Sequence, residues 1–338
     1  MKNKIEFFFA AVFFFSLGFQ SFPQGTENAE AKVKPFSISV TPFFSVDFAG
    51  QGEYVHHKDS DMVWSYLNWE SYPLFNAGIG LDFSIFGVGV SASVKGAFPG
   101  ACGKMEDSDW DNVHDSLDPG KYGGIKSRYT KSDNYLESSL DVRTRIFYDF
   151  HINKIFTLSP VIGFDFNHTA FVARGLDGSY SQKIGGYYRQ WDDPAYSSAQ
   201  YKDSSVDVIT LVRNRFMTWF GFRWSVRMGK CFYTGVEWSL SPFCWIESLD
   251  SHILRSTLFY DLMHGFFQSV SAAFEIGWQF NSKNRLGFNV EYTYLGKIYG
   301  NTSSGAMYSK KVYPSSDSYA AADYSSLSIT LSYTYIFL

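Results

Sequence analysis

Residues 327–337 read LSITLSYTYIF, and this stretch decides the fold class. Its odd positions are apolar, and its even positions are Ser or Thr, with Ile336 the exception. Successive side chains of a β-strand point to opposite faces, whereas a helix would repeat its apolar residues every three or four positions. The stretch therefore predicts a strand with one oily face and one polar face.

The same alternation recurs along the chain, in segments that begin near residues 36, 67, 88, 136, 156, 220, 236, 270, 286 and 327. Short connections at residues 84–87, 151–154, 229–230 and 281–284 alternate with longer polar ones. A two-sheet sandwich would also alternate, but its strands are shorter and its connections do not fall into two classes. The pattern favours an all-β, antiparallel transmembrane β-barrel of about ten strands, with long extracellular loops and short periplasmic turns.

Composition agrees with a barrel in a membrane. Aromatic residues make up 20% of the 338 residues, while the mean hydropathy is only −0.15. In a barrel the hydropathy of the lipid-facing residues is offset by that of the lumen-facing residues, which gives such a near-neutral average. The polar faces carry charges of both signs, which indicates a filled interior and no open pore. A net charge of −4 and a pI near 6.0 give no reason to expect a nucleic-acid partner.

The first residues have the composition of a secretory signal. Lys2 and Lys4 precede an apolar run at residues 7–19, which is too short to cross a bilayer as a helix. We predict a signal peptide at residues 1–25, with cleavage somewhere within 20–31, and a single outer-membrane barrel domain at 32–338.

Two pairs of polar residues are candidates for chemistry. Asp107 and Asp109 are two positions apart at the end of a predicted strand, so both carboxylates face one small volume and at least one pKa should be raised. Asp250 and His252 repeat the spacing, and a carboxylate beside a histidine fixes its tautomer, as a general base requires. Taken alone, an Asp-rich loop is more often simply solvated.

Several segments around these pairs resemble the omptin family of outer-membrane proteases. The similarity extends from about Glu53 to the C-terminus, but only three parts of it are specific. These parts are Met105, Asp107, Asp109 and Trp110 with Ser127, Arg128, Asn134, Tyr135 and Leu140; residues 171–180; and residues 245–252. The terminal aromatic on the oily face also resembles an outer-membrane assembly signal.

The resemblance implies an endopeptidase in the outer membrane of a diderm bacterium, with its active site at the extracellular mouth of the barrel. His252 and Asp107 would flank the attacking water, Asp250 would orient His252, and Asp109 would support Asp107. Cleavage would occur beside a basic residue, whose side chain an acid such as Glu53 would bind. The implied partners are a peptide or protein substrate and outer-membrane lipid.

The chain departs from the family pattern at several positions. The second acid expected near the Asp–His pair is Ser248, and the histidine expected after Arg128 is Tyr129. Lipopolysaccharide activates omptins, but the acid and arginine that bind its phosphate are Phe166 and His168 here. No cofactor is therefore expected.

Other interpretations stay open. Asp107, Asp109 and His252 could hold one divalent ion, and residues 107–118 could bind calcium, although we rank both below metal-free water activation. The barrel could also be a non-catalytic adhesin or structural protein. Motifs such as G-x-S-x-G, H-E-x-x-H and C-x-x-C are absent.

The protease interpretation also requires Asp250 and His252 to face the barrel interior. Strict alternation from Val236 and Leu240 would turn Asp250 and His252 toward the lipid. We therefore predict a break in the strand between Pro242 and Asp250.

Overall fold

A computed structural model of the chain describes residues 36–59, 62–111, 124–309 and 311–337. The predicted signal peptide lies outside these residues, as does most of the possible calcium loop, and both stay predictions. No helix among the described residues is long and apolar enough to cross a membrane.

The strands are β1 (Phe36–His57), β2 (Val63–Ile85), β3 (Val88–Ala97), β4 (Gly100–Asp111), β5 (Ile125–Tyr148), β6 (Phe150–His151), β7 (Phe156–Ser181), β8 (Lys183–Ile184), β9 (Tyr187–Tyr188), β10 (Ser197–Met228), β11 (Phe232–Ser241), β12 (Cys244–His252), β13 (Thr257–Gly265), β14 (Ser269–Gln279), β15 (Asn284–Ala306), β16 (Tyr313–Pro314) and β17 (Ser318–Ile336). Two short 3-10 helices are η2 (Ile253–Arg255) and η3 (Met307–Ser309).

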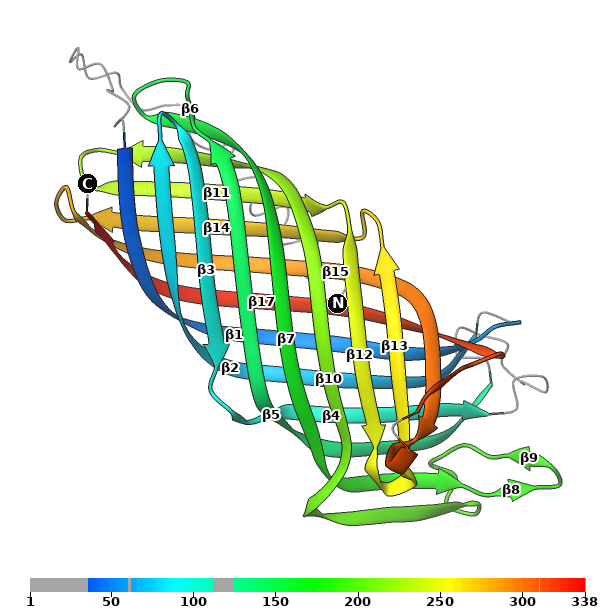
Figure 1. The fold of residues 1–338 in the computed structure, drawn as a ribbon. Helices are drawn as coiled ribbons and strands as arrows, with labels where there is room; N and C mark the ends of the chain where they lie inside the picture. Colours follow the sequence, from blue (N-terminus) through cyan, green and yellow to red (C-terminus); the bar gives the residue numbers. More distant parts are fainter. Residues whose placement is uncertain (1–35, 60–61, 112–123, 310, 338) are drawn as a thin grey trace. The chain divides into compact units, whose positions relative to one another are not determined.

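The strands pair into a closed antiparallel ring (Figure 1). Around the ring the order is β1, β2, β3, β5, β7, β10, β11, β14, β15 and β17, and β17 pairs back with β1. In part of the wall β4, β12 and β13 take the places of β3, β11 and β14. The predicted all-β barrel of ten strands is confirmed.

The two ends of the barrel differ as the connection lengths predicted. At the end that holds the C-terminus, β2 and β3 are joined by Phe86 and Gly87 alone. At the other end the strands continue well into the segments predicted as loops, so that β1 reaches His57 and β7 reaches Ser181. The candidate residues consequently lie on strands that are hydrogen-bonded on both sides, a more rigid position than a loop.

Three of the ten strands are interrupted along their length. The interruptions fall at Phe98–Pro99 between β3 and β4, at Pro242–Phe243 between β11 and β12, and at residues 266–268 between β13 and β14. Between these breaks and the barrel end that holds the C-terminus, the outer face carries an exposed apolar belt, for example Phe44, Leu81 and Leu331. The candidate site lies on the other side of the breaks, beyond this belt.

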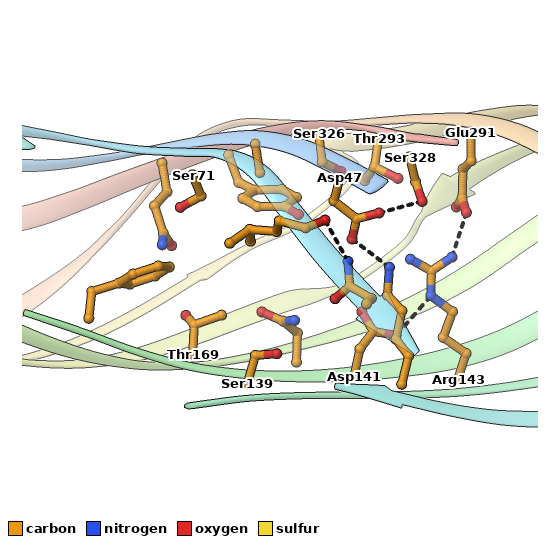
Figure 2. A pocket seen from close by; sticks show the side chains of 18 residues that line it. Asp47, Ser71, Ser139, Asp141, Arg143, Thr169, Glu291, Thr293, Ser326 and Ser328 are labelled. Atoms are coloured by element: carbon orange, nitrogen blue, oxygen red, sulfur yellow. Dashed lines mark hydrogen bonds and ion pairs between the residues drawn. The ribbon is translucent and has the colours of Figure 1, made fainter. Parts of the chain in front are cut away.

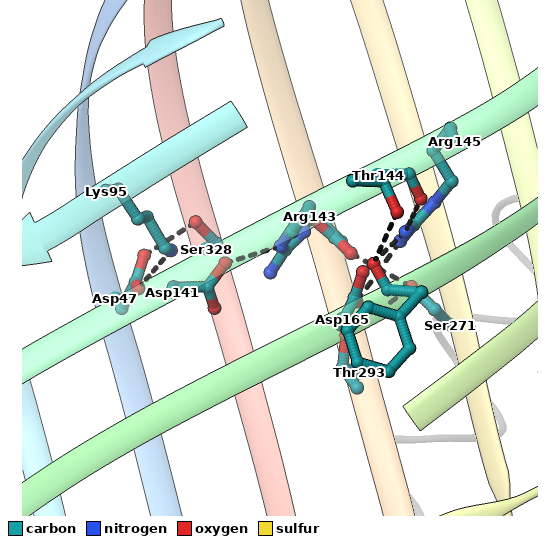
Figure 3. Close-up of polar contacts among 12 residues, drawn as sticks. Asp47, Lys95, Asp141, Arg143, Thr144, Arg145, Asp165, Ser271, Thr293 and Ser328 are labelled. Atoms are coloured by element: carbon teal, nitrogen blue, oxygen red, sulfur yellow. Dashed lines mark hydrogen bonds and ion pairs between the residues drawn. The ribbon is translucent and has the colours of Figure 1, made fainter. Parts of the chain in front are cut away.

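The inner face of the belt region is filled by ion pairs (Figure 3). They include Lys95–Asp47 at 2.6 Å, Arg143–Glu291 at 2.6 Å, Arg145–Asp165, and Arg223–Glu237 at 2.8 Å. Cavities of about 40 Å³ and 330 Å³ remain, and both are lined by Arg143 and Glu291. Figure 2 shows the smaller one, with both residues on its wall. The interior is divided by its own side chains, as expected for a small barrel.

An apolar layer lies above the ion pairs, inside the barrel. Trp69, Met105, Leu136, Phe171 and Leu211 form one part of it, and all are at most 2% exposed. A second cluster, from the remaining wall, contains Ile246, Met263, Leu295 and Ile298. The smaller cavity is lined by Phe171 of this layer, by Gln51 and by the ion-paired Asp47 and Arg143, so apolar and polar groups meet there.

Candidate active site

The break at Pro242–Phe243 turns Asp250 and His252 toward the interior. Phe220 of β10 pairs with Leu240, and Met217 pairs with Cys244, so three steps along β10 face four along the neighbouring strand. One surplus residue reverses which face each side chain takes. The predicted break between Pro242 and Asp250 is confirmed.

Thr218 stabilises this break. Its hydroxyl accepts a hydrogen bond from the Phe243 amide at 3.1 Å and lies 3.2 Å from the Phe243 carbonyl oxygen, and its own amide donates to that oxygen at 3.0 Å. Pro242 has no amide hydrogen to lose at this point. The irregular backbone is thus satisfied without regular pairing.

Asp250 and His252 form a close buried pair. The Asp250 Oδ2 atom lies 2.8 Å from His252 Nε2, and the two residues are 4% and 8% exposed. When Nε2 donates to the carboxylate, Nδ1 is left to act on a water or a substrate. The imidazole ring also packs edge-on against Phe259, with ring centroids 5.1 Å apart.

Asp107 and Asp109 reach the interior from β4. The register of β4 against β2 pairs Asp107 with Leu67, an apolar residue of the interior layer, and Asp109 with Ser65. Asp107 is 9% exposed, and its Oδ1 atom is buried without a hydrogen-bond partner in the described part of the chain. Of the two carboxylates, Asp107 is therefore the one free to hold a water.

Two arginines hold Asp109. Arg128 Nη1 lies 3.4 Å from its Oδ2 atom, and Arg255 Nη2 lies 3.7 Å from the same atom. Arg128 comes from the neighbouring strand β5, and Arg255 comes from η2, directly after His252. Arg255 consequently connects the β4 pair with the β12 pair.

The two pairs are close enough to change each other's proton affinity. Burial and the charge of Asp109 raise the pKa of Asp107 to about 7, although His252 and Arg255 oppose this. Burial lowers the pKa of His252, but Asp250, by charge and hydrogen bond, and Asp107 outweigh it and raise the pKa to about 9. Between these values Asp107 is a carboxylate and His252 an imidazolium, opposite charges on opposite walls.

Glu53 is inside the barrel but already has a cationic partner. It is 2% exposed, and its Oε2 atom lies 3.5 Å from Nη2 of Arg213, which is also 2% exposed. Burial, together with the nearby Asp250, raises the pKa of Glu53 well above its usual range. Asp261 of β13 joins this group, and burial raises its pKa to about 6.

Sequence reasoning missed Arg213, Asp261 and Arg255 as members of this region. Arg213 was only one of several charges on the polar strand faces, and Asp261 lay in a segment, residues 250–264, predicted as a long polar loop. Their contacts depend on strands far apart in the chain. Arg255 follows His252 by three residues, a proximity that could have suggested it.

The positions that depart from the omptin pattern have other contacts. The Tyr129 ring packs at a tilt against Trp191, with ring centroids 4.7 Å apart, and Lys126 lies over the Tyr129 ring. His168 Nδ1 lies 2.8 Å from the Asn214 side chain, and Phe166 packs on Phe216. Within the described ranges, no three His, Cys, Asp or Glu side chains converge as metal ligands do.

Comparison with known proteins agrees with the fold. The crystal structure of the outer membrane protease OmpT from Escherichia coli superposes with a TM-score of 0.75 at 16% identity, covering 90% of this chain and 99% of that one. The outer membrane protein OprG from Pseudomonas aeruginosa gives a TM-score of 0.33 at 10% identity, covering 90% and 96%. That score is too low to support an argument. No curated protein matches the chain.

A sequence model of one family covers most of the chain. The model of the Omptin family matches residues 48–337, which include both pairs of candidate residues and nine of the ten strands of the ring in full. We conclude that the chain is an outer-membrane β-barrel protein and belongs to the omptin family.

Proposed function

We propose that this barrel is an endopeptidase in which Asp107 and His252 activate one water between them. The observation that carries the proposal is the inward-facing Asp250–His252 pair, 2.8 Å apart, with Asp107 within electrostatic reach on the opposite wall. The site faces the cell exterior in this proposal, because the short turns of bacterial outer-membrane barrels are periplasmic.

The order of the two pKa values suggests which group acts as the base and which as the acid. Near neutral pH the Asp107 carboxylate takes a proton from the water, whose oxygen attacks the peptide carbonyl carbon. The His252 imidazolium donates a proton to the leaving amine as the carbon–nitrogen bond breaks. Transfer of a proton from Asp107 to His252 then returns both residues to their starting protonation states. The sequence alone had predicted histidine as the base, whereas the higher pKa of His252 favours it as the acid.

Asp250 and Asp109 have supporting roles. Asp250 fixes the imidazole orientation through Nε2 and keeps it protonated. Asp109 raises the proton affinity of Asp107, as a neighbouring negative charge must. Burial of Asp107, Asp250 and His252 strengthens these effects, because charges interact more strongly away from water.

The test is hydrolysis of internally quenched peptides by the refolded barrel. Replacing Asp107, Asp109, Asp250 or His252 by Ala should lower kcat/KM by about 10²-fold or more, the usual contribution of a positioned acid or base. Asp133→Ala is the matched control, because Asp133 is an exposed carboxylate that pairs with Lys104.

The outcomes separate the two interpretations of the barrel. Wild-type turnover that disappears in the four variants and persists in Asp133→Ala would support the peptidase. Four folded variants with wild-type kcat/KM would eliminate these residues as the catalytic group. Inactivity of the folded wild type toward diverse peptides would favour the adhesin or structural interpretation.

A further inference from the structure

Arg213 is held on several sides by the residues around Glu53. Its Nε atom donates to the Ser248 hydroxyl at 2.9 Å, and Nη1 donates to the Gln51 side chain at 3.2 Å. Nη1 also lies 3.4 Å from the Gly52 carbonyl oxygen, and Nη2 lies 3.5 Å from Glu53 Oε2. Polar groups of β1 and β12 thus contact the guanidinium, and Nη2 and Glu53 Oε2 form an ion pair without a hydrogen bond among the described residues.

This arrangement lies directly beside the candidate catalytic residues. Arg213 pairs with Ser248 in the sheet, two positions before Asp250, and both face the interior. The charges of Asp250 and His252 both act on Glu53, which confirms that the acid is near the reactive groups. A cationic side chain that reached Glu53 from this site would therefore compete with the Arg213 head group for the same acid.

We infer that Arg213 fills the Glu53 site from within, as a built-in cation, and that the enzyme therefore selects peptides with an uncharged residue beside the cleaved bond over peptides with Lys or Arg there. The inference rests on the proposed peptidase function. Repulsion by a buried guanidinium disfavours a second cation, because few waters screen the two charges.

The neighbouring Arg215 provides a matched control. It is on the same strand, faces the same interior and is 4% exposed. Its guanidinium lies over the Tyr324 ring, 3.5 Å from the centroid. Arg215→Ser therefore removes a buried inward arginine without uncovering Glu53.

The first experiment compares kcat/KM for two peptides that differ only in having Arg or Gln before the cleaved bond. Wild type should favour Gln. Arg213→Ser should raise the Arg-to-Gln ratio by about 10- to 100-fold, the gain expected for a buried, charge-assisted hydrogen bond. Arg213→Lys and Arg215→Ser should keep the wild-type ratio, and Arg213→Ser with Glu53→Gln should lose the gain.

The second experiment does not need turnover. In the His252→Ala background, calorimetric titration with N-acetylarginine amide should show binding to Arg213→Ser, but no binding to the barrel that retains Arg213. Folding of each variant is verified by heat-modifiable migration on gels.

Two results would overturn the inference. One is a wild type that prefers Arg or binds the probe, a result that requires no variant to fold. The other is a folded Arg213→Ser barrel with the wild-type ratio and no probe binding. Absence of cleavage in every active-site-intact protein would count against the peptidase alone, and the titration would then decide the inference.

Discussion

The Asp107 carboxyl group is buried beside Asp109, and His252 is buried beside Asp250, yet their pKa values move to about 7 and about 9 by different routes. Burial opposes charge on both groups. Asp109 adds to that effect at Asp107, whereas Asp250 reverses it at His252. The result is a carboxylate and an imidazolium that coexist at neutral pH.

This pair predicts a bell-shaped pH profile. We expect kcat/KM to rise as Asp107 loses its proton near pH 7 and to fall as His252 loses its proton near pH 9. The two limbs belong to the coupled pair. Arg255→Gln should move both limbs to higher pH, because the Arg255 cation lowers the pKa of both groups.

The control for this profile is Arg174→Gln, which removes an arginine paired with Asp207 on the exterior. Its profile should match that of the wild type. An acidic limb that stays in place or moves to lower pH in Arg255→Gln would contradict the assignment of that limb to Asp107.

At the residue scale, the sequence predicted the four candidate side chains but not what surrounds Glu53. Spacing of two along a strand is a local property, so Asp107 with Asp109 and Asp250 with His252 could be paired by inspection. The contact of Arg213 with Gln51 joins residues 162 positions apart. Local alternation does not contain the register that brings such strands together.

At the element scale, the alternation of apolar and polar residues located the strands. Continued without a break, it would assign the residues of β12 to the wrong face. The phase conflict between Leu240 and Asp250 required one surplus residue, which the structure has at Pro242–Phe243. The lengths of the strands were harder to predict. Polar residues at 53–57 and 103–111 resemble loop sequence, although sheet neighbours satisfy their backbone groups.

The apolar layer beneath the site should be a major source of stability. Phe171 of β7 is 1% exposed, and its ring centroid lies 6.1 Å from that of Trp69. Phe171→Ala should lower the free energy of unfolding by about 3–5 kcal/mol, through lost burial and the cavity left behind. Urea unfolding of the reconstituted barrel would measure this.

The comparison for that measurement is Tyr308→Ala in η3, because Tyr308 is 89% exposed. It should leave the unfolding free energy within about 0.5 kcal/mol of the wild type. Equal losses in the two variants would mean that the layer is not a well-packed core.

At the scale of the whole molecule, the barrel interior holds both ion pairs and apolar clusters. Ion pairs such as Arg143–Glu291 fill the belt region. The apolar cluster around Trp69 includes Leu67 and Ile209, which pair with Asp107 and His252 in the sheet. The sequence predicted a filled ring of about ten strands from strand length and charge of both signs. It did not predict the apolar layer, because inward apolar residues break the alternation on which that prediction relied.

The most direct test of the account is a map of the bonds cut in a diverse peptide library by the refolded, heat-modifiable barrel. Mass spectrometry would identify cut sites for the wild type and for His252→Ala in parallel. We predict internal cleavage by the wild type and cleavage slower by about 10²-fold or more by His252→Ala, because the imidazole donates the proton to the leaving amine in the proposed mechanism. Identical cut sites and rates for both proteins, or no wild-type cleavage, would contradict the claim that this barrel is an Asp–His peptidase.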